Sequence, residues 1–172
     1  MIDCPLCDSQ NIEGEDYCQQ CGQPLSDTHL AQPPTAVERA LIRDRIATLA
    51  PATPITVSPE APVREVLTLL VERKIGCVLV MDGKELQGVF TERDAIAKLA
   101  GEVEQLGQRP VSDFMTPAPQ TLQADAKIAF AVRQMDQGGY RHIPLVDEDG
   151  HPVGIISVRD LLRYFTDKMH QK

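Results

Sequence analysis

The sequence predicts a mixed α/β (α+β) domain in which one strand-helix-strand-strand-helix unit occurs twice, preceded by a small segment that folds around a metal ion. The first supporting observation is an internal repeat: Thr56 matches Thr121 at an offset of 65 residues, and Gly88 matches Gly154 at an offset of 66. The one inserted residue falls in a turn, where insertions are tolerated. The second observation is that four of the five cysteines lie near the N-terminus.

The elements of each copy follow from the spacing of apolar side chains. Apolar residues at positions i, i+3, i+4 and i+7 from Val63 predict a helix that faces the core. Short apolar runs bounded by turn residues predict strands. The first copy is expected to have strands at 55–57, 77–81 and 86–90, with helices that begin at 63 and 91. The second is expected to have strands at 121–122, 143–146 and 153–156, a helix through 128–135 that stops at Gly138, and a last helix through 161–169.

The sequence divides into three parts. The predicted boundaries are a metal-binding segment at 1–27, a polar linker at 28–36, and a repeat domain at 37–172 with copies at about 51–106 and 110–168. An apolar stripe from Val37 through Ile46 to Leu49 predicts one helix that packs on the repeats. Because a single copy is too short to bury both faces of its sheet, the two copies are expected to pack with pseudo-twofold symmetry.

The cysteines near the N-terminus have the spacing of a metal site. Cys4 and Cys7 form one C-x-x-C pair, and Cys18 and Cys21 form another after ten residues. Each pair can turn both sulfurs toward one centre, so that two pairs complete the tetrahedron that zinc prefers. Disulfides are one alternative, which reduced intracellular thiols disfavour, and iron in a rubredoxin-like site is another. Metal binding would supply the folding free energy of so small a segment, about 10–16 kcal/mol for comparable sites.

This segment resembles the short zinc ribbons that begin many bacterial and archaeal proteins, with the pattern C-P-x-C followed by C-x-x-C-G-x-P-L. The second half is matched by Cys21-Gly22-Gln23-Pro24-Leu25, and the departure is Asp8, where glycine is usual. Gly22 and Asp8 follow the last cysteine of each pair, at positions that often need a positive φ.

The charge distribution argues against nucleic acid as a partner. The formal charge is −8, and residues 1–38 contain seven acidic residues but no lysine or arginine, which is the wrong sign for a phosphate backbone. Tryptophan is absent and aromatic residues are scarce, so few rings are available for base stacking. No segment approaches the ~20 apolar residues of a membrane span. The protein is therefore expected to be cytoplasmic, with a ribbon that contacts a protein partner.

Two motifs at corresponding positions carry a family resemblance. They are Gly-x-x-Thr-x-x-Asp at 88–94 and Gly-x-x-Ser-x-x-Asp at 154–160, and Arg-His-Ile-Pro-Leu-Val-Asp at 141–147 accompanies them. Together they resemble a tandem pair of cystathionine beta-synthase (CBS) domains, or Bateman module, over about residues 40–168. The resemblance implies clefts that bind adenosine-containing ligands such as AMP, ADP, ATP or S-adenosylmethionine, and it implies a homodimer.

The chemistry of these residues fits such a ligand. Glycine lets the backbone pass close to it, and the hydroxyl residue lies at a helix N-terminus that attracts phosphate. The carboxylate can accept two hydrogen bonds from a ribose diol. The alternative is that Thr-x-x-Asp and Ser-x-x-Asp are N-capping sequences that need no ligand.

The resemblance implies that each cleft combines the motif of one copy with strand entrances of the other. One cleft would comprise Thr91, Arg93, Asp94, Gln120, Thr121, Tyr140, Arg141 and His142, and the other Ser157, Arg159, Asp160, Thr56, Ile75, Gly76 and Cys77. Because Arg141 stands where the first copy has Gly76, the Asp94 cleft would have the extra cation for phosphate. Asp94→Ala is then expected to weaken binding more than Asp160→Ala.

Three functions remain open. The first is a regulatory sensor in which an adenosine nucleotide binds the repeats and the ribbon reports this to a partner. The second is a zinc-ribbon scaffold whose repeats mainly dimerise it. An enzyme is disfavoured, because no serine, cysteine or carboxylate pair has a base beside it in the sequence. Cys77 in particular is interpreted as a small buried apolar side chain.

Overall fold

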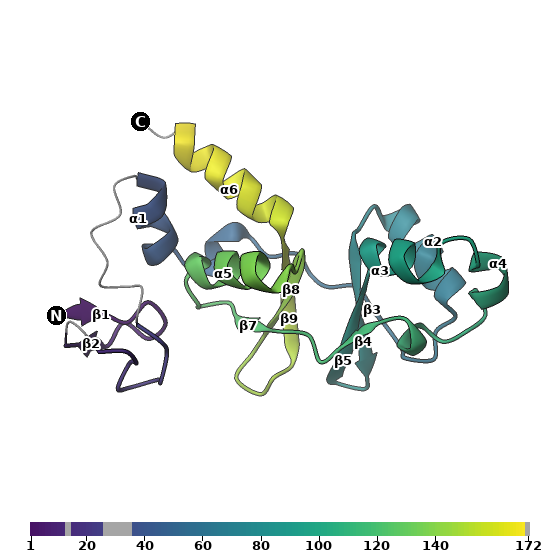
Figure 1. Cartoon of the computed structure of the whole chain (residues 1–172), viewed down its shortest axis with the longest axis horizontal. Helices are drawn as coiled ribbons and strands as arrows, with labels where there is room; N and C mark the ends of the chain where they lie inside the picture. Colours follow the sequence, from purple (N-terminus) through teal and green to yellow (C-terminus); the bar gives the residue numbers. More distant parts are fainter. Residues whose placement is uncertain (13–14, 26–35, 171–172) are drawn as a thin grey trace. The chain divides into compact units, whose positions relative to one another are not determined.

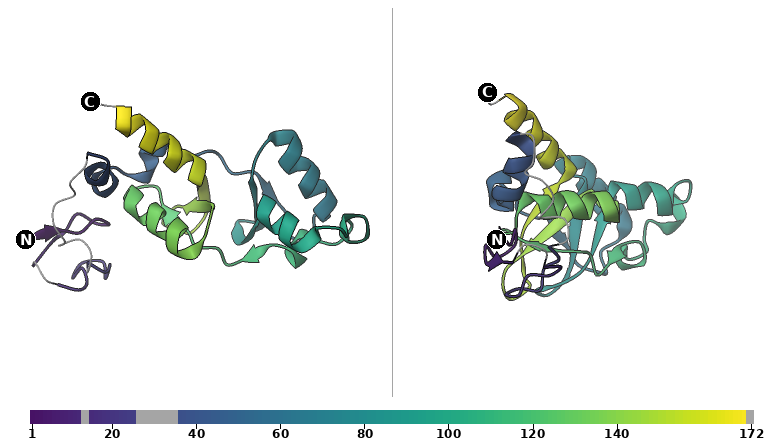
Figure 2. Two further views of the ribbon diagram at one scale, coloured as in Figure 1. Left: turned by 45° about the horizontal axis from the view of Figure 1, so that its top comes forward. Right: turned by 60° about the vertical axis from the view of Figure 1, so that its left-hand side comes forward.

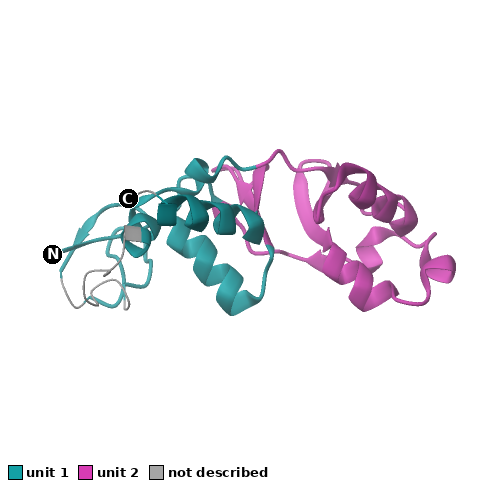
Figure 3. Ribbon diagram, turned by 90° about the horizontal axis from the view of Figure 1, so that it is seen from above, with its two compact units in different colours: residues 1–51, 123–141, 157–172 teal, residues 52–122, 142–156 magenta. Residues whose placement is uncertain are grey.

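The computed structural model describes residues 1–12, 15–25 and 36–170. Its contacts divide the chain into two compact units built from segments that are far apart in the sequence. Unit 1 comprises residues 1–51, 123–141 and 157–172, and unit 2 comprises residues 52–122 and 142–156 (Figure 3). The predicted linker at 28–36 lies, apart from its last residue, outside the described residues.

Unit 2 contains the first copy of the repeat with the predicted order of elements. They are β3 (Thr56–Val57), α2 (Val63–Arg73), β4 (Cys77–Asp82), β5 (Glu85–Thr91) and α3 (Glu92–Leu99). Three short elements that the sequence analysis missed follow them: α4 (Val103–Leu106), the 3₁₀ segment η2 (Val111–Asp113) and β6 (Thr116–Pro117). The sheet has the order β3-β4-β5-β6, in which β3 runs parallel to β4 and the other neighbours are antiparallel.

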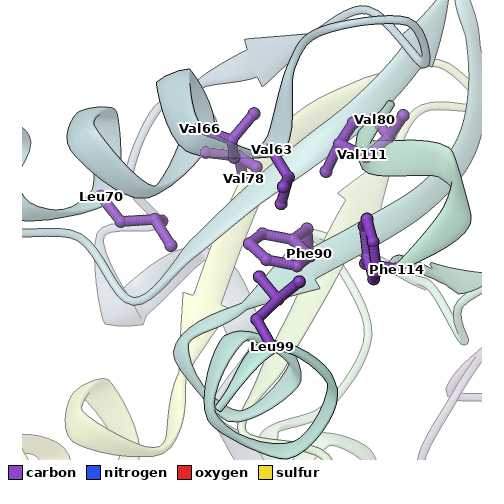
Figure 4. Packing of buried hydrophobic residues seen from close by; sticks show 9 residues of the cluster. All are labelled: Val63, Val66, Leu70, Val78, Val80, Phe90, Leu99, Val111 and Phe114. Carbon is purple, nitrogen blue, oxygen red and sulfur yellow. The ribbon is translucent and has the colours of Figure 1, made fainter. Parts of the chain in front are cut away.

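Both faces of the β4-β5 hairpin are buried, which explains the unbroken apolar run at 77–81. One face packs against α2, α3 and the segment that contains η2; its cluster comprises Val63, Val66, Leu70, Val78, Val80, Phe90, Leu99, Val111 and Phe114 (Figure 4). On the other face, Cys77, Leu79 and Val89 form a second cluster, against which Ile155 packs. The hairpin is therefore the centre of the unit 2 core.

The second copy has the predicted strands and helices too. β7 (Leu122–Gln123), β8 (His142–Val146) and β9 (Pro152–Ser157) form a three-stranded sheet in the order β7-β8-β9. α5 (Ile128–Gly138) precedes β8, and α6 (Val158–His170) follows β9. α5 ends in the predicted glycine pair, because Gly139 takes the left-handed conformation at φ 64° that caps a helix without strain.

The helices of unit 1 are joined by polar as well as apolar contacts. α1 (Ala36–Arg43) lies against α5 and α6 (Figure 1, Figure 2). Beyond its end, the Asp44 carboxylate accepts a hydrogen bond of 2.8 Å from the Tyr164 hydroxyl and lies 2.9 Å from Lys168 Nζ. These contacts fix the chain that follows α1 to α6.

The single helix predicted from Val37 to Leu49 is wrong in its second half. The helix ends at Arg43, and Ile46–Leu49 form the separate 3₁₀ segment η1. Between them Arg45 is extended (φ −95°, ψ 154°), because this stretch pairs with the chain before α5: the Ile46 N–H donates to Ala126 O and the Ala47 N–H to Ala124 O. Ile46 and Leu49 are buried nonetheless, as the apolar stripe predicts, whereas Ile42 of the same stripe is exposed.

The N-terminal segment has little apolar interior, as the sequence predicts. β1 (Ile2–Asp3) pairs with β2 (Gln10–Asn11) in antiparallel fashion, and the buried cluster consists of Cys4, Cys18 and Leu25. Gly22 and Asp8 both have positive φ, at 73° and 56°. Among the described residues, no helix combines the length and apolar composition needed to cross a membrane.

Candidate functional site

The first motif forms a complete capping box at the start of α3. Thr91 is the N-cap residue, and its Oγ1 accepts a hydrogen bond from the Asp94 backbone N–H at 3.2 Å. In return, Asp94 Oδ2 accepts from the Thr91 backbone N–H at 3.0 Å and from Thr91 Oγ1 at 2.6 Å. Thr91 and Asp94 therefore cap α3, as their spacing predicts.

The other carboxylate oxygen of Asp94 contacts the side chains of two residues that were not predicted from the sequence. Asp94 Oδ1 accepts from Thr116 Oγ1 at 3.2 Å and lies 2.9 Å from Lys98 Nζ. The same ammonium donates to the carbonyls of Phe114 at 2.6 Å and Met115 at 3.2 Å. Lys98 stands four residues after Asp94 on α3, a spacing that favours such a pair, whereas nothing local in the sequence points to Thr116.

These contacts determine the ionisation of Asp94. Burial alone would raise the pKa of Asp94, but the hydrogen bonds from Thr91 and the Lys98 ammonium outweigh it and hold the pKa below its usual value. A carboxyl group whose pKa is lowered by folding stabilises the fold above its unfolded-state pKa of about 3.9. That stabilisation is lost as the pH falls through the lower pKa of the folded state.

Asp94→Asn is expected to lower the free energy of unfolding by about 2 kcal/mol at neutral pH, because charge-assisted hydrogen bonds are lost. Urea unfolding of both proteins measures this difference. Below pH 4 the difference should shrink, since the wild-type carboxyl then protonates as well. A difference that stays constant with pH would contradict a role for the Asp94 charge.

The second motif has the same side-chain contacts at its helix start, but its carboxylate has fewer hydrogen-bond and ion-pair partners. Asp160 Oδ2 accepts from the Ser157 backbone N–H and from Ser157 Oγ, both at 2.7 Å. Among the described residues, the contact found at Oδ1 is a long one of 3.5 Å from Arg163, whose side chain is exposed. The Val158 N–H, the first of α6, donates to the Arg141 carbonyl at 2.9 Å. This contact places the backbone of Arg141 beside the second motif.

The corresponding strand entrance of the first copy is crowded. The Glu92 N–H donates to the Gly76 carbonyl at 3.1 Å. A Cβ atom at Gly76 would lie 3.0 Å from two atoms of the His142 ring and 3.3 Å from Glu92 Oε2. The start of β4, the start of α3 and the start of β8 therefore converge at Gly76, where a larger residue would displace the imidazole or the carboxylate.

The two glycine positions that the sequence analysis did not connect to packing also have neighbours. A Cβ atom at Gly88 would lie 2.5 Å from Met115 Sδ and 2.9 Å from the Thr116 carbonyl, so Gly88 permits the close approach of β6. At Gly138 a Cβ atom would lie 2.1 Å from the Tyr140 ring. Tyr140 is thus folded against the end of α5.

The remaining predicted ligand residues lie at the starts of strands and helices. Gln120 and Thr121 precede β7, Ile75 precedes β4, Thr56 begins β3, and Arg93 and Arg159 lie in the first turns of α3 and α6. Tyr140, Arg141 and the second motif belong to unit 1, whereas the other predicted ligand residues belong to unit 2.

Burial and the nearby Asp94 charge raise the pKa of Cys77 to about 12, so Cys77 remains a neutral thiol at physiological pH.

The four N-terminal cysteines form a cluster suited to a metal ion. The Sγ atoms of Cys4 and Cys21 lie 3.6 Å apart, as do those of Cys7 and Cys18, and all four lie within 4.8 Å of one another. Four sulfurs at ~2.3 Å from a tetrahedral metal are separated by roughly 3.8 Å. The cluster could therefore hold a metal, and none of the five cysteines forms a disulfide.

Two of the four sulfurs lie in surroundings that favour the thiolate form that binds metals: hydrogen bonds lower the pKa of Cys7 and Cys18, whereas burial raises the pKa of Cys4 and Cys21. Burial opposes ionisation of Cys18, yet Ser9 and the backbone groups of Cys21 and Gln20 hold the pKa of Cys18 at about 5. Ser9 Oγ lies 3.0 Å from the sulfurs of both Cys7 and Cys18. Such second-shell groups orient the ligands of a metal site.

Asp8 has a specific set of partners in unit 1. Its carboxylate forms ion pairs with Arg45 and with Lys127, whose Nζ lies 2.9 Å from Asp8 Oδ1 and whose side chain is largely buried. Lys127 is the residue immediately before α5. The departure from glycine at position 8 therefore supplies an anion that contacts the two cations, which sequence spacing could not predict because both are distant along the chain.

Known proteins match about two thirds of this chain. An uncharacterized protein of Methanopyrus kandleri is 31% identical over 110 residues, which covers 63% of this chain and 56% of that protein. An uncharacterized 17.7 kDa protein of Acidianus ambivalens is 29% identical over 124 residues, which covers 72% and 74%. The match thus spans little more than half of the first relative's own length.

Solved structures give the same result. A CBS-domain protein of Agrobacterium tumefaciens is 30% identical with a TM-score of 0.64 and covers 70% of this chain and 95% of that one. The protein CBSX2, solved in complex with AMP, is 26% identical with a TM-score of 0.62, and the match covers 73% and 98%. A CBS-domain protein of Pyrobaculum aerophilum, also solved with AMP, is 25% identical with a TM-score of 0.62, and the match covers 72% and 99%.

The family model of the CBS domain matches the chain twice, at residues 46–101 and 111–167. Each match contains one of the two capped motifs, Thr91 to Asp94 in the first and Ser157 to Asp160 in the second. The chain therefore belongs to the CBS domain family and contains two CBS domains in tandem.

Proposed function

We propose that this protein is a regulatory sensor whose CBS pair binds an adenosine-containing ligand. The observation that carries the proposal is that each copy presents a hydroxyl and a carboxylate together at a helix N-terminus directly after a strand. AMP in two structures at 25% identity or above supports the choice of an adenine nucleotide. The ligand set to be tested comprises AMP, ADP, ATP and S-adenosylmethionine.

Each part of such a ligand has a chemical counterpart. A ribose diol donates two hydrogen bonds, which a carboxylate can accept. A phosphate is favoured by the free N–H groups and the dipole of a helix N-terminus, and an arginine adds a cation. Arg141, with its backbone joined to the first turn of α6, and Arg159 within that turn are the candidates in unit 1.

We also propose that the metal of the N-terminal cluster is zinc, and that the zinc ribbon relays the ligand state to a protein partner. Four thiolates at tetrahedral spacing suit zinc, and Cys4, Cys7, Cys18 and Cys21 would hold it. The role of this metal is structural, since all four positions are filled by protein ligands. A homodimer in the cytoplasm, without a nucleic-acid or membrane partner, completes the proposal.

A thermal-shift titration of the zinc-loaded protein tests the proposed ligand class. At about 100 times its dissociation constant a ligand adds about 2.7 kcal/mol, which raises the midpoint of a chain this size by roughly 5 to 10 °C. GMP controls for the base, and 2′-deoxy-AMP, which lacks the diol, controls for the ribose. A shift with adenosine ligands that both controls reduce is expected. Absence of any shift would favour a dimerising scaffold instead.

A further inference from the structure

We propose that the chain binds one adenosyl ligand, at the Ser157–Asp160 motif, and that the Thr91–Asp94 motif is a closed structural cap held by Lys98 and Thr116. The inference rests on the proposed function, because it concerns which of the two CBS motifs receives the ribose. It reverses the ranking expected from the sequence, in which Asp94 was the stronger candidate.

The two carboxylates differ in the number of hydrogen bonds that they already accept. A carboxylate has about four lone-pair directions. Those of Asp94 receive the Thr91 N–H, the Thr91 hydroxyl, the Thr116 hydroxyl and the Lys98 ammonium. Among the residues that the structure describes, Asp160 receives the two Ser157 donors at Oδ2 and a long contact from Arg163 at Oδ1. Asp160 therefore has an oxygen for a ribose diol, and Asp94 does not.

The contact between Asp94 and Lys98 is held by further hydrogen bonds of both residues. An ammonium has three protons, and Lys98 Nζ has three acceptors within 3.2 Å: Asp94 Oδ1 and the carbonyls of Phe114 and Met115. A ribose at Asp94 would have to break a charge-assisted contact between partly buried groups and leave donors without acceptors. On α6, Arg163 contacts Asp160 at a long distance of 3.5 Å and has an exposed side chain, so a ligand can displace it at little cost.

The charge at the N-termini of α3 and α6 differs as well. α3 begins with Glu92, whereas α6 begins with Val158, and an arginine follows in both. A carboxylate in the first turn already uses the favourable helix dipole and repels a phosphate. The first N–H of α6 donates to the Arg141 carbonyl, while the equivalent N–H of α3 donates to that of Gly76. The second motif thus combines a cation with a helix start at which Asp160 is the one acidic residue, whereas the first turn of α3 has both Glu92 and Asp94.

The matched variants Asp160→Asn and Asp94→Asn, studied in the full-length zinc-loaded protein, test this inference. Isothermal titration with AMP should give one ligand per wild-type chain. Asp160→Asn should weaken binding at least tenfold, because a hydrogen bond to a charged acceptor is lost. Asp94→Asn should change the dissociation constant less than threefold. Two ligands per chain, or equal losses from both variants, would overturn the inference.

Further variants separate a binding effect from a folding effect. Asp160→Asn must retain the wild-type circular dichroism spectrum, and Ser157→Ala offers a second way to weaken the same motif. If Asp94→Asn does not fold, Thr116→Val removes one donor of the cap and should leave AMP affinity unchanged. Full affinity in Asp160→Asn would overturn the site assignment while the proposed function survives. If the wild type binds none of AMP, ADP, ATP and S-adenosylmethionine, both the site assignment and the proposed function are overturned.

Discussion

Cys18→Ser is expected to abolish stoichiometric zinc binding and to unfold the N-terminal ribbon while the CBS pair stays folded. The buried cluster of this segment contains Cys4, Cys18 and Leu25, so its folding free energy must come from the metal, about 10–16 kcal/mol for comparable sites. The substitution removes the Cys18 thiolate, whose pKa is lowered to about 5 by hydrogen bonds from Ser9 and neighbouring backbone groups. A serine hydroxyl cannot replace that ligand.

Released zinc, quantified with a chelating dye, and amide NMR spectra of residues 1–25 measure the effect of Cys18→Ser. Wild type should release one zinc per chain and show dispersed ribbon signals that collapse when a strong chelator is added. Cys77→Ala is the matched control, because Cys77 is the one cysteine outside the cluster and its loss should leave the zinc content unchanged. Ribbon signals that remain dispersed without metal would contradict the metal-dependent fold.

Phe90→Ala is expected to cost about 3–5 kcal/mol of unfolding free energy. Phe90 is completely buried in the unit 2 core, among side chains from α2 and α3 (Figure 4). Its removal leaves a cavity that the surrounding hairpin and helices can fill only in part. Because small domains are stable by only about 5–15 kcal/mol, this loss is a large fraction of the total.

Urea unfolding of Phe90→Ala beside Ile96→Ala tests the core assignment. Ile96 lies on α3 in the same unit, but its side chain is 73% exposed, so its truncation should change the free energy by no more than about 0.5 kcal/mol. Comparable losses from the two variants would show that the hairpin is not the core of unit 2.

Much of the fold could be predicted because its signals are local. The spacing of Val63, Val66 and Leu70 predicted α2, and all three side chains are buried. Two cysteine pairs at fixed spacing predicted both the sulfur cluster and the positive φ values at Asp8 and Gly22. The pseudo-twofold packing of the two copies, which depends on contacts between them, stays a prediction.

What sequence analysis missed depends on contacts between distant segments. The helix ending at Arg43 is interrupted because residues 44–47 pair with the chain before α5, some 80 residues away. The same limit applies to the site: Thr116 lies 22 residues beyond Asp94 and meets it only because β6 pairs with β5. Two motifs that look equivalent in the sequence therefore differ in the number of hydrogen-bond and ion-pair partners of their carboxylates.

Isothermal titration of the zinc-loaded wild-type protein with AMP, ADP, ATP and S-adenosylmethionine tests the central claim most directly. We predict saturable binding of at least one of these ligands, with one ligand per chain and a marked loss of affinity in Asp160→Asn. Failure of all four to bind would contradict it, and the CBS pair would then be a scaffold whose two capped motifs only stabilise their helices.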